Sequence, residues 1–131
     1  MRKSVAAVLV TAATVAGMGF AVTPANAAGS CSSGNICLFE NNDYNQGNTN
    51  HWRDFRGNVR NFNDYNWVGS NDNMDNETSS IKNRRGCTIT LYQHIAWEGA
   101  NSDFSNGAND GFLANNSVGD NRASSIDSWC D

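Results

Sequence analysis

Apolar residues beyond position 28 occur in short runs that Asn, Asp, Gly and Ser separate, and the runs show little helical periodicity. Four of the runs have the length of β-strands, namely residues 36–39, 50–55, 88–93 and 100–104. In the stretch T-I-T-L-Y of the third run, β-branched and aromatic residues alternate with others, as on a half-buried strand. The pattern therefore predicts an all-β domain of short antiparallel strands.

A six-residue pattern of oxygen-bearing side chains occurs twice and indicates a duplicated unit. Residues 75–80 read D-N-E-T-S-S, residues 120–125 read D-N-R-A-S-S, and an isoleucine follows each copy. Carboxylate, amide, hydroxyl and backbone carbonyl oxygens are the ligands that Ca²⁺ prefers. The repeated stretch is therefore a candidate calcium loop in each half.

An aromatic pattern precedes each copy of this stretch. It consists of an aromatic residue, four intervening residues, a second aromatic residue and a nearby glycine, which predicts a folded hairpin with the glycine at a strained turn position. The first half also carries about eight extra residues within 60–73. This stretch is polar and rich in Asn, which predicts a loop that is not rigid. The hairpin residues are Phe39, Tyr44 and Gly47 in the first half and Tyr92, Trp97 and Gly99 in the second.

The first 27 residues have the features of a secretory signal peptide. Arg2 and Lys3 precede an apolar stretch at 5–22, and residues 25–27 read A-N-A, the form of a signal-peptidase site. A membrane anchor is disfavoured because Thr and Gly interrupt the apolar stretch and no cationic stop follows it. We expect cleavage near Ala27, which would release residues 28–131 as one small secreted, extracellular domain.

The charge of that domain excludes some partners. Without the leader the chain keeps seven cationic and 13 acidic side chains, a formal charge of −6. An acidic surface argues against nucleic acid and anionic membranes as partners and is compatible with cation binding. We expect a monomer with no nucleic-acid partner and no membrane anchor.

Four cysteines in a short exported domain predict two disulfides. Three pairings are possible, and the sequence alone does not decide among them. We favour a local link in the first half and a second link across the second half. A zinc site is disfavoured because the spacing contains no C-x-x-C pair. The favoured pairs are Cys31–Cys37 and Cys87–Cys130.

The two aromatic hairpins, each followed by its D-N-x-x-S-S stretch, resemble the βγ-crystallin family, in particular its small microbial calcium-binding members. The resemblance implies two Greek-key motifs, about 36–82 and 87–129, packed as a β-sandwich in which each sheet borrows a strand from the other motif. The expected core comprises Leu38, Ile81, Ile89, Leu91, Phe104 and Ile126, completed by Trp52, Phe55, Trp97 and Trp129.

The same resemblance implies how Ca²⁺ would be held. Asp75 with Ser79, and Asp120 with Ser124, would donate side-chain oxygens to one ion each. Glu40, Glu77, Gln93 and Arg122 would each donate a backbone carbonyl, and water would complete the shells. One certain carboxylate per ion predicts micromolar to sub-millimolar affinity. We expect the Asp75 site to be the tighter, because Glu77 adds negative charge there while Arg122 adds positive charge at the other.

Catalysis is disfavoured, because the chain has no nucleophile or zinc-protease motif and its two histidines, His51 and His94, occur in unlike contexts. The expected function is a non-catalytic calcium-binding module with a structural or stress-related role. The start of the domain, residues 31–41, also resembles Streptomyces-type metalloprotease inhibitors of the same fold, so inhibition of a secreted peptidase is the alternative. A killer-toxin-like antimicrobial role is a further alternative.

Overall fold

The computed structural model of the chain describes residues 30–130, so the expected signal peptide and its cleavage near Ala27 lie outside the described residues. No helix among the described residues is long and apolar enough to cross a membrane. The strands are β1 (Ile36–Phe39), β2 (Trp52–Phe55), β3 (Ser80–Asn83), β4 (Ile89–His94), β5 (Glu98–Phe104), β6 (Asn109–Asp110) and β7 (Ser125–Ser128). Short 3₁₀ turns are η2 (Asn42–Gly47), η3 (Phe62–Asp64), η4 (Ile95–Trp97) and η5 (Leu113–Asn115).

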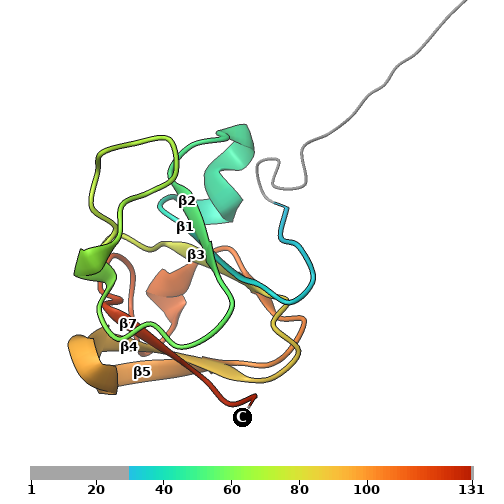
Figure 1. The fold of residues 1–131 in the computed structure, drawn as a ribbon, viewed down its shortest axis with the longest axis vertical. Coiled ribbons are helices and arrows are strands. Elements are labelled where there is room, and N and C mark those ends of the chain that lie inside the picture. Colours follow the sequence, from blue (N-terminus) through green and yellow to red (C-terminus); the bar gives the residue numbers. More distant parts are fainter. Residues whose placement is uncertain (1–29, 131) are drawn as a thin grey trace, which may run out of the picture.

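The strands form two antiparallel sheets, one with the order β2-β1-β3-β6 and the other with the order β5-β4-β7 (Figure 1). Strand β6 comes from the second half of the chain but pairs with β3 of the first half. In the opposite sense, Val59 of the first half forms an isolated bridge with Ile126 of β7. The expected all-β sandwich of crystallin type is therefore confirmed. The exchange between the halves is a strand, β6, in one direction and a single bridge at Val59 in the other.

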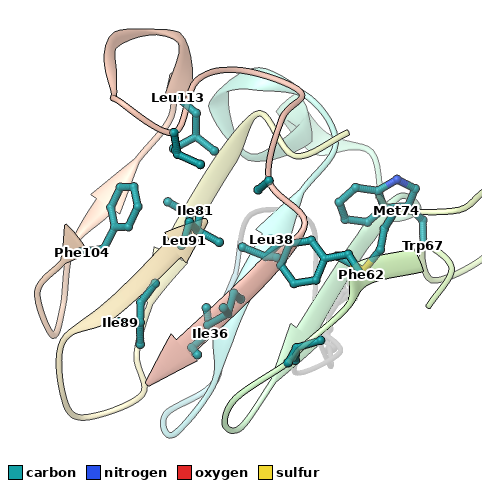
Figure 2. Packing of buried hydrophobic residues seen from close by; sticks show 14 residues of the cluster. Ile36, Leu38, Phe62, Trp67, Met74, Ile81, Ile89, Leu91, Phe104 and Leu113 are labelled. Carbon is teal, nitrogen blue, oxygen red and sulfur yellow. The ribbon is translucent and has the colours of Figure 1, made fainter. Parts of the chain in front are cut away.

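The core lies between the two sheets and follows the alternation of the strands. Ile36 and Leu38 of β1 and Ile81 of β3 have no exposed surface, and neither do Ile89 and Leu91 of β4 (Figure 2). Because successive strand residues point to opposite faces, these alternate positions all turn inward. Burial of such side chains supplies most of the favourable free energy of folding.

The expected contribution of tryptophans to the core is wrong: Trp52 is half-buried outside the core cluster, and two others are exposed. Trp129 is 61% exposed and Trp97 is 39% exposed, whereas Trp67 is only 1% exposed. Trp129 follows β7 at the outer side, where its indole Nε1 donates to Thr90 Oγ1 at 2.9 Å. Trp67, Phe62 and Met74 instead fill one end of the core (Figure 2).

The extra residues of the first half form an ordered hairpin. Asn66 and Asn73 form an antiparallel bridge, and the Trp67 amide donates to the Asp72 carbonyl at 2.9 Å. The hairpin also hydrogen-bonds to the start of β2, because the Val68 amide donates to the Trp52 carbonyl at 3.0 Å. The expectation of a loop without rigidity is wrong, because Trp67 anchors this polar segment in the core.

Each cysteine pair forms the favoured disulfide. Cys31 and Cys37 are joined with Cα atoms 5.8 Å apart, and Cys87 and Cys130 with Cα atoms 5.2 Å apart. The first bond ties the start of the domain to β1, and the second ties the segment just before β4 to the segment just after β7. The two links therefore hold one sheet each.

The first aromatic hairpin packs as its pattern predicts. The rings of Phe39 and Tyr44 meet edge to face with centroids 5.7 Å apart, and the Lys82 ammonium lies 4.3 Å from the Tyr44 ring centroid. Burial lowers the pKa of Lys82, with a further contribution from the Arg84 guanidinium. Burial also raises the pKa of Tyr44. The hairpin is thus packed against β1 and β3.

Gly99 in the second hairpin has a left-handed φ of +86°, and an added Cβ would lie 2.5 Å from His94 Cδ2. Gly99→Ala is therefore expected to lower the free energy of unfolding by about 1–3 kcal/mol, measured by urea denaturation. Gly57 is the matched control, because a Cβ there meets nothing within 4 Å. Equal stability of the two alanine variants would contradict this role for Gly99.

Candidate metal centre

The two D-N-x-x-S-S loops cross and hydrogen-bond to each other. The backbone N–H of Asn76 in the first loop donates to the backbone carbonyl of Ala123 in the second at 3.0 Å. The backbone N–H of Asn121 in the second loop donates to the backbone carbonyl of Thr78 in the first, also at 3.0 Å. Asn76 and Asn121 occupy the same position in the two copies and both have left-handed φ, +60° and +56°. Asn is among the few side chains that tolerate this conformation, which explains why both copies carry it.

The side chains repeat this crossing. Ser79 Oγ donates to Asn121 Oδ1 at 3.1 Å, and Ser124 Oγ donates to Asn76 Oδ1 at 3.3 Å. We expected Asp75 to accompany Ser79 and Asp120 to accompany Ser124. The structure instead brings each serine to the asparagine of the opposite loop, because the loops cross instead of closing on themselves.

The two aspartates lie behind these asparagines. Asp75 Oδ2 accepts a hydrogen bond from Asn76 Nδ2 at 3.0 Å, and Asp120 Oδ2 accepts one from Asn121 Nδ2 at 3.4 Å. Each bond turns the amide so that its oxygen faces the opposite serine. The other oxygen of each aspartate, Oδ1, is buried without a hydrogen-bond partner in the described part of the chain. Buried carboxylate oxygens without partners are costly, so a ligand or water could satisfy them.

Two clefts open beside the crossing, and we name them after the residues at the third position of the two loops. The Glu77 cleft is lined by Glu40, Asn41, Asn42, Asn76, Glu77, Ser79 and Asn121. The Arg122 cleft is lined by Asn76, Gln93, His94, Ile95, Arg122 and Ser124. Six of the eight expected ligand residues therefore lie in a cleft, divided three and three, while Asp75 and Asp120 line neither. Asn76 lines both clefts.

The clefts differ in charge. The Glu77 cleft contains two acidic residues, Glu40 and Glu77, whereas the Arg122 cleft contains a guanidinium. The Glu77 carboxylate is fixed in place, since its Oε2 accepts a hydrogen bond from the buried Trp67 indole at 2.9 Å. A cation would therefore meet a more favourable potential in the Glu77 cleft.

The oxygen atoms of the crossing fit a Ca²⁺ shell. Oxygens that share one Ca²⁺ at about 2.3–2.6 Å lie about 3 Å from each other. The paired oxygens of Ser79 and Asn121 lie 3.1 Å apart, and Asn42 Oδ1 of the same cleft is buried without a hydrogen-bond partner among residues 30–130. The cleft therefore offers neutral hydroxyl and amide oxygens, with carboxylates nearby. Such oxygen ligands suit a hard divalent cation.

Besides His94 and Ile95, four asparagines of the clefts were not anticipated as site residues from the sequence: Asn41, Asn42, Asn76 and Asn121. For the last two a signal was present, because the second position of the pattern is asparagine in both copies. Asn41 and Asn42 lie between the first strand and its hairpin, in a segment with many asparagines. No sequence pattern distinguishes these two from the other asparagines of the segment.

Comparison with known proteins agrees with this architecture. The β/γ-crystallin of Ciona intestinalis is 18% identical, covers 72% of this chain and 99% of its own, and has a TM-score of 0.57. Spherulin 3a of Physarum polycephalum is 19% identical, covers 84% and 89%, and has a TM-score of 0.51. The N-terminal domain of protein S is 28% identical, covers 72% and 93%, and has a TM-score of 0.53.

No curated protein matches the chain. The model of peptidase inhibitor family I36 matches residues 24–104, which is more than half of the sequence. The solved structures establish the βγ-crystallin fold, and the family match covers both disulfide-bonded cysteines of the first half together with the inserted hairpin. The chain therefore belongs to peptidase inhibitor family I36.

Proposed function

We propose that this protein is an exported, non-catalytic calcium-binding module that holds one ion in each of the two clefts beside the crossed loops. The observation that carries the proposal is the pairing of a serine hydroxyl from one loop with an asparagine oxygen from the other, twice, at 3.1 and 3.3 Å. Each pair offers two oxygens at the spacing of neighbouring Ca²⁺ ligands. The two disulfides agree with export, because such bonds persist in oxidising compartments.

Charge ranks the two clefts. Glu40 and Glu77 favour an ion in the Glu77 cleft, and the cationic Arg122 opposes one in the other cleft. The proposal therefore keeps the order expected from the sequence, with the site at Glu77 the tighter. It revises the ligands, because Asn121 accompanies Ser79 and Asn76 accompanies Ser124. The aspartates orient these asparagines, and their unpartnered oxygens add negative charge nearby.

The proposal predicts that calcium stabilises the folded protein. An ion that binds only the native state at 100 times its dissociation constant adds about 2.7 kcal/mol per site. For a domain of this size that corresponds to a rise of about 10 °C in the melting temperature. Thermal melting followed by tryptophan fluorescence, with millimolar CaCl₂ and then with excess chelator, measures the shift. Identical melting temperatures in both conditions, with MgCl₂ as the ionic-strength control, would contradict calcium binding.

Inhibition of a secreted metallopeptidase is the second candidate function. Membership of the I36 family favours it. The hairpin at 66–73 also favours it, because an inhibitor needs a rigid exposed segment that enters a cleft. Trp67 anchors this hairpin in the core, while Gly69 and Asn71 at its tip are exposed. A titration of thermolysin-type enzymes separates the candidates: tight inhibition that is unchanged by chelation of calcium on the inhibitor would favour this second function.

A further inference from the structure

We propose a third metal site, adjacent to the Glu77 cleft and sharing Glu40 with it, in which Glu40, His51 and Asp72 bind a transition-metal dication of the zinc class. The proposal does not depend on calcium binding, because its ligand atoms are an imidazole nitrogen and two carboxylate oxygens of the side chains. We call these three residues the His51 cluster. One ligand atom from each of them lies within 4.8 Å of the others.

The imidazole of His51 is directed into the cluster. Its Nδ1 lies 2.5 Å from Glu40 Oε2. In the described residues the same nitrogen is buried and has no hydrogen bond of acceptable geometry. The contact is shorter than an ordinary N–H···O hydrogen bond, whose atoms lie about 2.7–3.2 Å apart. A metal ion between the two atoms would satisfy both lone pairs at once.

The backbone holds His51 in this position. Its amide donates to the Val68 carbonyl at 3.0 Å, and its carbonyl accepts from the Glu40 amide at 3.1 Å. The same carbonyl accepts a second hydrogen bond, from Asn45 Nδ2 at 2.8 Å. His51 also has a left-handed φ of +61°, which three hydrogen bonds to separate segments keep in place.

The other two residues are equally constrained. Glu40 directly follows β1 and pairs with His51 through the backbone. Asp72 lies in the inserted hairpin, where its carbonyl accepts from the Trp67 amide and its own amide donates to Ser70 Oγ at 2.9 Å. Three segments that are far apart in the sequence therefore present one donor each to the same point. Because the three backbones are already held, only the side chains lose conformational entropy when they bind an ion.

The chemistry of the donors selects the ion. One imidazole with two carboxylates is a ligand set for Zn²⁺ and its neighbours, with open positions left for water. Calcium takes oxygen ligands and gains nothing from the imidazole. Ligands on a tetrahedral zinc lie about 3.3 Å from each other, so Glu40 and His51 would separate by less than an ångström and Asp72 would move inward. Neither carboxylate forms an ion pair with lysine or arginine within residues 30–130, so two negative charges would meet the cation.

A zinc titration of the whole exported protein by calorimetry tests the site. We expect one equivalent of Zn²⁺ to bind, and we expect His51→Asn and Asp72→Asn each to weaken binding at least ~10-fold. Asn suits position 51 because it tolerates left-handed φ. His94→Asn and Asp64→Asn are the matched controls, since they remove the other histidine and another carboxylate of the inserted segment. Both controls should bind zinc as the unchanged protein does.

Co²⁺ supplies a spectroscopic signature. Absorption in the visible range that reports a nitrogen ligand should appear in the unchanged protein and disappear in His51→Asn, while the calcium-dependent rise in melting temperature remains. Absence of zinc binding by the unchanged protein would overturn the proposal. So would unchanged binding in both cluster variants, or equal loss in His94→Asn. None of these results bears on calcium binding, whose own failure would show in the melting experiment.

Discussion

Removal of the Cys87–Cys130 disulfide by Cys87→Ala with Cys130→Ala is expected to lower the free energy of unfolding by about 4 kcal/mol. The bond closes a loop across a sequence separation of 43 residues, so it restricts the unfolded chain strongly. The Cys31–Cys37 bond spans a separation of only six residues, and its removal is expected to cost about 2.3 kcal/mol. The long bond also joins the neighbouring strands β4 and β7 at one end of their sheet, where Ile89 pairs with Ser128.

Urea denaturation of the two double-alanine variants beside the unchanged protein measures both losses. Each variant keeps the other disulfide, so the two serve as controls for one another. The expected order is a larger loss for the long loop, at a similar dependence on denaturant concentration. Equal losses, or a larger loss for the short loop, would contradict the view that these bonds act mainly on the unfolded chain.

Trp67→Ala is expected to lower the free energy of unfolding by about 3–5 kcal/mol, because a large aromatic side chain leaves a cavity in the core. Trp67 is only 1% exposed and packs with Phe62 and Met74 at one end of the sandwich (Figure 2). Its indole also donates to Glu77 Oε2 at 2.9 Å, so the substitution frees a carboxylate of the Glu77 cleft. The inserted hairpin would lose its anchor at the same time.

Trp129→Ala is the matched control for this effect. Trp129 is 61% exposed, and its indole donates a hydrogen bond to Thr90 Oγ1. Its removal should cost about 1 kcal/mol or less. Chemical denaturation followed by circular dichroism compares the two variants without relying on tryptophan emission. A similar cost for both would show that Trp67 does not anchor the hairpin in solution.

Much of the fold follows from the local pattern of the sequence. The β1 run and the T-I-T-L-Y run predict strands because alternate apolar residues need a buried face, and the structure places strands at Ile36–Phe39 and Ile89–His94. The local pattern does not predict strands β3 and β7, because S-I-K-N and S-I-D-S are short and polar apart from one isoleucine. Only the resemblance to the βγ-crystallins placed Ile81 and Ile126 on strands. Their strand conformation comes from pairing with β1 and β4, a tertiary effect that periodicity does not reveal.

The candidate site was only partly predictable for a related reason. The resemblance to the βγ-crystallins assigns Asp75 and Ser79 of one loop to the same ion. Contacts between loops depend on how the two halves pack, and this packing brings Asn121 to Ser79. Trp67 illustrates the same limit, because a polar stretch rich in Asn gives no sign that its one tryptophan is buried. His51 and Asp72 likewise meet only in the folded chain.

The crossing of the loops is most directly tested by calcium calorimetry of Ser79→Ala, Asn121→Gly and Ser124→Ala beside the unchanged protein. Glycine at position 121 keeps the left-handed backbone and removes only the side-chain oxygen. The crossed arrangement predicts that Ser79→Ala and Asn121→Gly, although 42 residues apart, weaken the same and tighter of two sites. Ser124→Ala should weaken the other site. Loss of the weaker site in Asn121→Gly, or no calcium bound by the unchanged protein, would contradict the account.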